Sequence, residues 1–222
     1  MRRINFRSVA VTLGATALYF FLVIWAWGDF RQFFADPART GLVVAMIVLA
    51  VATSFSGFSG FSKGRTEMTS NRWVLVPLII MMIATVCLVP YLDARNWWTI
   101  GGKTVRLVGL ALFLIGGTIR TASIITLGHR FSALVAIQEN HKLQTEGLYR
   151  VVRHPSYLGL LLSTAGWCLV FNSALGLLLT VSMLVPLVGR IRAEEKFMLE
   201  EFGEEYAAYR RRTRWRLLPP IY

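Results

Sequence analysis

The chain has 222 residues, of which 55% are hydrophobic, and a net charge of +12. Its mean hydropathy of +0.53 is too apolar for an ordinary soluble globular domain. The positive charge comes from 20 Arg and 4 Lys that flank apolar runs. That placement argues against a nucleic-acid-binding module and favours anchoring at a membrane surface.

The predicted elements begin with four apolar segments, each of about the 20 residues that a bilayer requires. They are residues 9–27, 41–58, 73–91 and 107–127. A fifth run, 157–188, is too long for one span and is interrupted by the turn-like sequence FNSALG at 171–176. We expect it to form a hairpin of two short helices. The fold class is therefore an all-α, polytopic membrane protein with about six membrane segments.

The hairpin is followed by the sequence RIRAEEKFMLEEFGEEYAAYRRRTRWR at 190–216, which holds six of the twelve carboxylates. Acids in the first turns and arginines in the last turns match the helix dipole. The segment therefore predicts an amphipathic helix at the cytoplasmic face of the membrane. Gly203 is expected to bend or break this helix.

Arginine and lysine set the expected orientation. They cluster before the first span, between the second and third, after the fourth, and in the C-terminal tail. With six spans, these four regions lie on one side, which predicts cytoplasmic termini. The loop at 93–106 also carries three cations and weakens this argument.

The polar chemistry is concentrated on either side of the predicted hairpin. A short hairpin returns both of its ends to one membrane face, so the flanking segments 129–153 and 190–216 are expected to meet there. We divide the chain into N-terminal spans at 1–128 and a core at 129–222. Arg190 and Glu194 are four residues apart and share a helix face, which suits a zwitterionic or cationic ligand. A local salt bridge between them is the alternative.

The start of the hairpin suggests an anion site. Pro155 fits the first turn of a helix. The N–H groups of Ser156 and Tyr157 are then expected to be free at a positive helix end, beside Arg153 and His154. The three histidines are 12 and 13 residues apart, which matches no helical spacing of metal ligands, and no metal is expected.

Two motifs in the last hundred residues carry a family resemblance. HKLQTEGLYRVVRHPSYLG precedes the hairpin, and RIRAEEKFMLEEFGEEYAAYRRRTRWRLLPPIY follows it. Together they resemble the isoprenylcysteine carboxyl methyltransferases and the related phospholipid methyltransferases. The resemblance covers about residues 129–222, and the first 128 residues match only as apolar spans.

The resemblance implies an integral membrane enzyme that uses S-adenosylmethionine. It implies that Arg190 is the catalytic residue and faces the methyl acceptor, and that Glu195 is a second candidate for the role of Glu194. The implied cofactor-binding residues are His141, Lys142, Leu143, Gln144, Tyr149, His154, Pro155, Ser156, Tyr157 and Glu194.

The residue types agree with this cofactor. His154 and backbone amides suit its carboxylate, Glu194 suits its hydroxyls or cation, and Leu143 and the tyrosines suit adenine. A carboxylate acceptor is already a nucleophile at neutral pH, so Arg190 would only have to hold it in line. The expected acceptor is lipidic, isoprenylcysteine-like, and enters sideways from the bilayer.

Other functions stay open at this point. A phospholipid-amine N-methyltransferase or a thiol S-methyltransferase would use the same cofactor pocket, although an amine would favour an acid or base where Arg190 stands. Membrane sterol reductases share an RHPxY hairpin and a P…Y ending, but they use a nicotinamide cofactor and are much longer. A non-enzymatic membrane protein would bind no S-adenosylmethionine.

Overall fold

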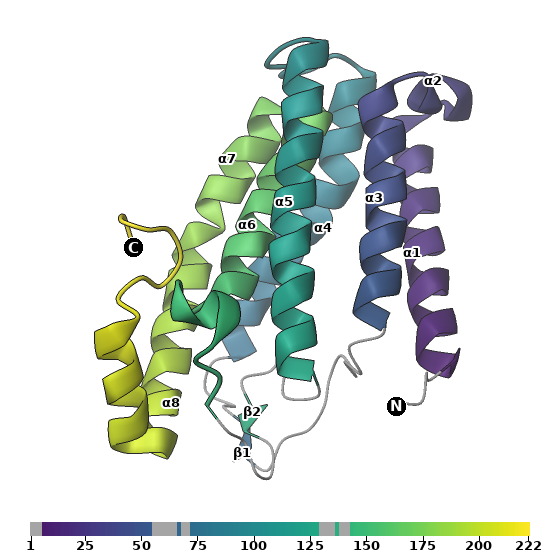
Figure 1. Ribbon diagram of the computed structural model, residues 1–222. Coiled ribbons are helices and arrows are strands. Elements are labelled where there is room, and N and C mark those ends of the chain that lie inside the picture. The colour runs from purple at the N-terminus through teal and green to yellow at the C-terminus, as the bar shows by residue number, and fades with distance from the viewer. Residues whose placement is uncertain (1–5, 55–65, 68–71, 129–135, 138–142) are drawn as a thin grey trace.

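The structure is a computed structural model that describes residues 6–54, 66–67, 72–128, 136–137 and 143–222. These residues form a helical bundle with one small antiparallel strand pair (Figure 1). The helices are α1 (Phe6–Trp27), α2 (Phe30–Phe34), α3 (Pro37–Ser54), α4 (Arg72–Ala94), α5 (Lys103–Leu127), α6 (Pro155–Val170), α7 (Ala174–Ser182) and α8 (Leu184–Arg212). A 3₁₀ helix, η3 (Gly147–Arg150), precedes α6, and the strands are β1 (Thr66–Glu67) and β2 (Ala136–Ile137).

The four predicted spans correspond to α1, α3, α4 and α5. Within the described residues, five helical stretches are long and apolar enough to cross a membrane, and the fifth combines α7 and α8. The sixteen-residue α6 is apolar but shorter. The expectation of a multi-helix membrane protein is confirmed, while the count of six spans stays a prediction.

The region of the predicted hairpin folds as α6 and α7. Helix α6 ends at Val170 and α7 begins at Ala174, so the turn lies inside the FNSALG sequence. Ser173 caps α7 by accepting a hydrogen bond from the N–H of Gly176 at 3.1 Å. Asn172, with a φ of 50°, supplies the left-handed residue of this turn.

The expectation of a separate amphipathic helix that begins at Arg190 was wrong. Helix α8 begins at Leu184, directly after α7, and continues through Arg190 to Arg212. Pro186 lies in the first turn of α8, where a missing N–H costs no helical hydrogen bond. Gly203 interrupts the helix with a φ of 50°, which confirms the predicted break.

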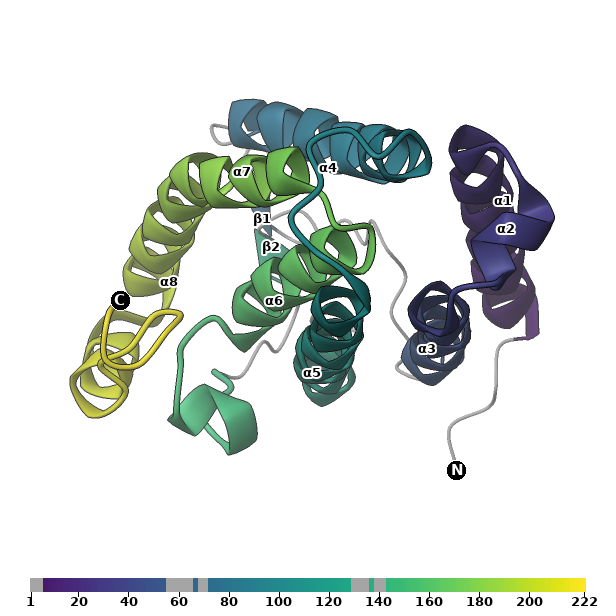
Figure 2. The ribbon, with the colours of Figure 1, turned by 90° about the horizontal axis from the view of Figure 1, so that it is seen from above.

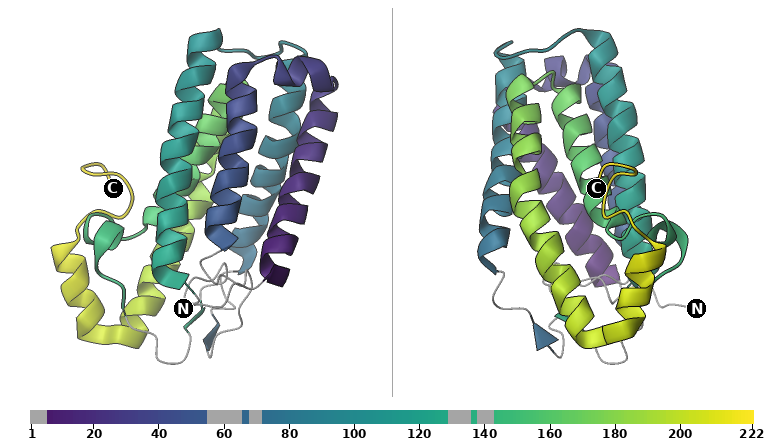
Figure 3. Two further views of the ribbon diagram at one scale, coloured as in Figure 1. Left: turned by 45° about the vertical axis from the view of Figure 1, so that its right-hand side comes forward. Right: turned by 90° about the vertical axis from the view of Figure 1, so that its left-hand side faces the viewer.

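The views agree on how the elements are arranged. The start of α1, the ends of α3 and α5 and the charged part of α8 lie at one end of the bundle, and α2 lies at the opposite end (Figures 1 and 3). Seen from above, α6 lies between α5 and α7, and α1 and α3 lie on the far side of α5 (Figure 2). The last part of α8 lies beside η3, away from the bundle.

Among the described helices, α5 and α6 make the most extensive contact. A Cβ at Gly116 of α5 would overlap the backbone nitrogen of Ser163 and lie 2.8 Å from the carbonyl oxygen of Gly159 on α6. Glycines on both helices thus let the two backbones touch, as in other membrane helix pairs. This contact fixes the N-terminus of α6 against the end of α5.

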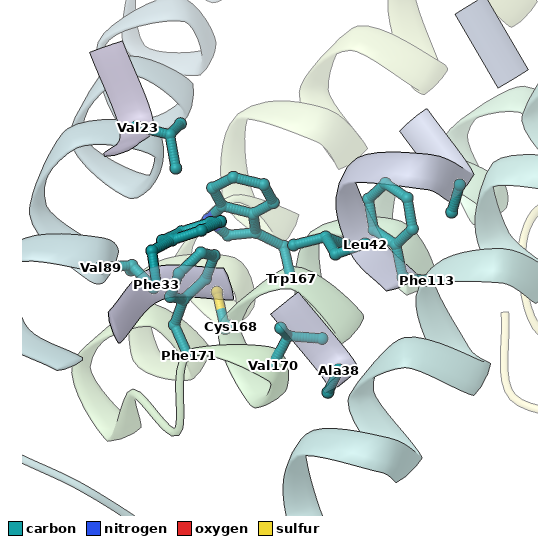
Figure 4. Packing of buried hydrophobic residues seen from close by; sticks show 11 residues of the cluster. Val23, Phe33, Ala38, Leu42, Val89, Phe113, Trp167, Cys168, Val170 and Phe171 are labelled. Atoms are coloured by element: carbon teal, nitrogen blue, oxygen red, sulfur yellow. The ribbon is translucent and has the colours of Figure 1, made fainter. Parts of the chain in front are cut away.

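The opposite end of the bundle holds the main apolar core. Phe33, Trp167 and Phe171 pack together there with buried aliphatic residues of α1, α3 and α4 (Figure 4). Beside this core, the fully buried carboxylate of Asp93 binds Arg39 at 3.0 Å and Arg106 at 2.6 Å. The core and the ion pairs hold α1 to α6 together at the end away from the charged part of α8.

Candidate functional site

The site lies where the residues before α6, the middle of α8 and the C-terminal tail meet. The backbone at Val152 forms a parallel bridge with Trp215. The N–H of Arg153 donates to the carbonyl oxygen of Trp215 at 2.9 Å, and that of His154 donates to Arg216 at 3.0 Å. The tail therefore holds the Arg-His-Pro segment in place against α8.

A hydrogen-bonded chain connects α8 with the first turn of α6. The Nε of Arg190 donates to the hydroxyl oxygen of Tyr157 at 2.7 Å. That hydroxyl donates to the Oε2 of Glu194 at 2.8 Å. Arg190 is only 5% exposed, so this guanidinium is buried at the level where the charged part of α8 begins.

His154 packs directly against the hydrogen-bonded residues Tyr157 and Glu194. Its ring stacks on Tyr157 with the ring centroids 5.6 Å apart and the planes 15° apart. Its Nδ1 is 4.0 Å from Glu194, and its Nε2 is 3.4 Å from Glu195. The imidazole therefore lies between the two neighbouring glutamates.

Glu195 faces a different set of partners from Glu194. Its carboxylate accepts from the Nε of Arg153 at 2.7 Å and from the Nε of Arg216 at 3.0 Å. Arg153 also donates to the carbonyl oxygens of Thr213 and Arg214. Burial lowers the pKa of Arg216, but the charge and hydrogen bond of Glu195 outweigh this effect and raise it. Glu195 thus joins the Arg-His-Pro segment, α8 and the tail.

The N-terminus of α6 differs from the expectation of two free N–H groups. Pro155 occupies the first turn of α6 as predicted. The N–H of Tyr157, however, donates to the carbonyl oxygen of His154 at 3.1 Å, because the first turn is already closed there. Arg120 of α5 donates to the carbonyl oxygen of Ser156 at 3.2 Å and so reaches this turn from the neighbouring helix.

The remaining predicted residues precede α6. Leu143 and Gln144 are half-buried and lie just before η3. Tyr149 is buried within η3, and its carbonyl oxygen accepts from the hydroxyl of Tyr209 on α8 at 2.7 Å. His141 and Lys142 lie outside the described residues. The structure therefore brings His154, Pro155, Ser156, Tyr157, Arg190 and Glu194 together and places Tyr149 against α8.

Two arginines of this site share a partner, Glu195, that the sequence did not predict. Arg153 is 8% exposed, and Arg216 pairs with the buried Glu195. In the sequence, both belong to basic clusters of the kind that usually lies on the surface. Only their position in the fold shows that they pair with Glu195. In the described part of the chain, no group of three or more His, Cys, Asp or Glu side chains is placed to hold a metal ion.

Comparisons with known proteins agree with the motifs. A family model described as the isoprenylcysteine carboxyl methyltransferase (ICMT) family matches residues 108–200. Protein-S-isoprenylcysteine O-methyltransferase B of Arabidopsis thaliana is 32% identical over 151 residues, which are 66% of this chain and 73% of that protein. The chain belongs to the isoprenylcysteine carboxyl methyltransferase family. The matched residues 108–200 include α6, α7 and the site residues of α8.

Two further similar proteins show which class of enzyme shares more of its length with this chain. Protein-S-isoprenylcysteine O-methyltransferase of Saccharomyces cerevisiae is 33% identical over 155 residues, 68% of this chain and 63% of that protein. A Delta(14)-sterol reductase of Methylotuvimicrobium alcaliphilum is 28% identical over 138 residues, 59% of this chain but only 32% of the reductase. The methyltransferases therefore share much more of their length with this chain than the reductase does.

A solved structure supports the fold of the family. It is that of the eukaryotic intramembrane Ras methyltransferase ICMT, with a TM-score of 0.58 and 19% identity. The similarity covers 96% of this chain and 77% of the other. The similarity extends over the N-terminal spans, which thus share the arrangement of helices in that structure.

Proposed function

We propose that this protein transfers a methyl group from S-adenosylmethionine to the carboxylate of a lipidic, isoprenylcysteine-like acceptor. The observation that carries the proposal is the partly buried series of hydrogen bonds from Arg190 through Tyr157 to Glu194. It joins a fixed guanidinium to a fixed carboxylate where charged and apolar surfaces of the protein meet. The names of the curated relatives support the same reaction.

The residues present fit this cofactor by their chemistry. When bound, S-adenosylmethionine supplies an electrophilic methyl group on a sulfonium centre. The carboxylate of Glu194 suits its hydroxyl groups or its cation, and the stacked rings of His154 and Tyr157 offer an aromatic wall. His141, Lys142, Leu143, Gln144, Tyr149, Pro155 and Ser156 complete the proposed cofactor-binding set.

Arg190 is the proposed catalytic residue. A guanidinium binds a carboxylate with two parallel hydrogen bonds, which fixes both the position and the angle of the acceptor. The acceptor needs no general base, because a carboxylate is ionised at neutral pH. The protein's contribution is then to hold the acceptor in line and to exclude water.

The two parts of the polypeptide have different proposed roles. We assign residues 129–222 to the methyltransferase core and residues 1–128 to spans on the side of the acceptor's lipid chain. The acceptor keeps that chain in the bilayer, and the cofactor enters from the cytoplasm. A reporter fused after Tyr222 is expected to report a cytoplasmic location, and a location on the other side of the membrane would contradict this orientation.

Cofactor binding is the direct test of the proposed function. Calorimetric titration of the detergent-purified protein should detect binding of S-adenosylmethionine and no binding of NADPH. Glu194→Gln should weaken S-adenosylmethionine binding about 10- to 100-fold, because a hydrogen bond to a charged group is worth roughly 1.5–3 kcal/mol. Glu204→Gln is the matched control, since Glu204 is an exposed acid of the same helix. Binding of NADPH alone would instead favour a reductase.

Transfer of a labelled methyl group identifies the acceptor. A prenylated cysteine with a free carboxylate should be methylated, whereas its methyl ester, a phospholipid amine and a simple thiol should not. Methylation of the amine in place of the carboxylate would replace the proposed acceptor with that of an N-methyltransferase.

A further inference from the structure

We propose that the Tyr157 hydroxyl is a positioning group that sets Arg190 relative to Glu194. This inference rests on the proposed function, in which Arg190 holds the acceptor and Glu194 holds the cofactor. Tyr157 would then align the two reactants by joining the side chains that bind them. Its role differs from that of a cofactor contact, because it acts through Arg190.

The geometry of the hydroxyl supports this role. The oxygen accepts a hydrogen bond from Arg190 at 2.7 Å, and the O–H donates a hydrogen bond to Glu194 at 2.8 Å. Both directions are fixed by chemistry, because a guanidinium only donates and a carboxylate only accepts. The hydroxyl is therefore oriented by two charged groups at once, and each charged group is oriented through it.

The tyrosine ring is itself held by its surroundings. It stacks on His154, and the guanidinium carbon of Arg190 lies 5.9 Å from the ring centroid. Its backbone belongs to the first turn of α6, which Arg120 contacts through Ser156. A hydroxyl on such a ring has little freedom to move away from Arg190 and Glu194.

The contact with Tyr157 is compatible with binding of an acceptor. Tyr157 uses the Nε of Arg190. An end-on grip on a carboxylate uses the two terminal nitrogens of the guanidinium instead. Tyr157 would thus fix the plane of the guanidinium while the acceptor binds at its end. A rotation of that plane would rotate the acceptor carboxylate with it.

The first test compares Tyr157→Phe with the wild type. Phenylalanine keeps the ring and its stacking and removes only the hydroxyl. We expect the single-turnover rate at saturating S-adenosylmethionine and acceptor to fall about tenfold or more, as for loss of a hydrogen bond to a charged group. Tyr19→Phe is the control, because Tyr19 packs against Trp167, about 15 Å along α6 from Tyr157. Its rate should match the wild type.

The second test asks whether Tyr157 acts through Arg190. In Arg190→Lys, the Nε contact is absent, so adding Tyr157→Phe should lower the single-turnover rate less than twofold. A merely structural hydroxyl would lower the rate by the same factor in both backgrounds, and that result would overturn the inference. A wild-type rate in Tyr157→Phe would overturn it as well.

The outcomes separate this inference from the proposed function. Failure of the wild type to bind S-adenosylmethionine or to methylate a carboxylate refutes the proposed function. An active wild type with an unaffected Tyr157→Phe refutes only the role of Tyr157. Thermal unfolding in detergent of all four variants and the wild type establishes that the rates are compared between folded proteins.

Discussion

Two adjacent glutamates of α8 have different partners because successive residues of a helix point about 100° apart. Glu194 is directed at Tyr157, in the chain that includes Arg190. Glu195 is directed at Arg153 and Arg216. At the scale of single residues, one acid therefore belongs to the proposed chemistry, and its neighbour holds the site together.

Arg190→Lys tests whether Arg190 contributes only its positive charge or also holds the acceptor carboxylate in line. Lysine keeps the positive charge but loses the planar pair of donors. We expect nearly normal S-adenosylmethionine affinity and a turnover about 10²-fold slower, as for reactants held out of line. Calorimetry and single-turnover kinetics on the same preparation measure the two effects. If Arg190 served only as a partner of Glu194, cofactor affinity would fall and saturated turnover would survive.

Glu195→Gln should destabilise the fold rather than change the chemistry directly. The substitution leaves two arginines, of which Arg153 is buried, without their negative partner. Loss of one member of a buried ion pair costs about 3–5 kcal/mol. Thermal unfolding in detergent measures this cost. Glu204→Gln is the control, because the Glu204 side chain is 79% exposed and should change stability by less than about 0.5 kcal/mol. Equal unfolding temperatures for the two variants would contradict the buried role of Glu195.

The α5–α6 pair is the decisive contact at the scale of elements. Gly116 and Gly159 bring the two backbones together, and Arg120, one turn further along α5, reaches Ser156. This contact places the first turn of α6, and with it Tyr157, against α5. The position of the site therefore depends on close packing between two membrane helices.

Gly116→Ala should separate these helices. The new methyl group would meet backbone atoms of Ser163 and Gly159, which cannot rotate away as a side chain could. Overpacking of this kind costs about 1–3 kcal/mol. Gly14→Ala is the matched control on α1, where no atom lies within 4 Å of the added carbon. A lower unfolding temperature for Gly116→Ala alone is expected, and unchanged stability would show that the two helices adapt.

At the scale of the whole molecule, charged groups lie at both ends of the bundle for different reasons. The end with His154 and Arg190 carries the proposed site. At the other end, Asp93 joins α3, α4 and α5 through Arg39 and Arg106 and accepts from Trp27 of α1 at 3.2 Å. This second cluster ties four helices together around one buried carboxylate.

Asp93→Asn should weaken the bundle without affecting the site directly. Arg39 would lose its carboxylate partner, whereas Arg106 would keep Asp36 at 3.4 Å, and the loss costs about 3–5 kcal/mol. Asp29→Asn is the control, because Asp29 caps the short helix α2 and asparagine caps equally well. Unfolding temperatures in detergent decide the comparison, and equal values would mean that Asp93 carries little of the stability. S-adenosylmethionine affinity of folded Asp93→Asn should match the wild type.

Much of the fold could be predicted from the sequence because hydropathy and length act locally. Runs of about 20 apolar residues are enough to identify α1, α3, α4 and α5 as membrane helices. The break at Gly203 and the turn at FNSALG follow equally from local chemistry. The start of α8 could not be predicted in this way. The sequence changes from apolar to charged residues at Arg190, but such a change does not interrupt a helix, and α8 runs through it from Leu184.

The sequence by itself determined the membrane character, the family motifs and the identity of Arg190, Glu194 and His154 as candidates. Only the tertiary structure decided how these residues pair. It placed Tyr157 between Arg190 and Glu194, and it paired Glu195 with Arg153 and with Arg216 of the tail. The physical reason is that a hydrogen bond depends on distance and direction between residues about 20 to 40 positions apart. Those distances are set by the packing of α5, α6 and α8, which no local pattern encodes.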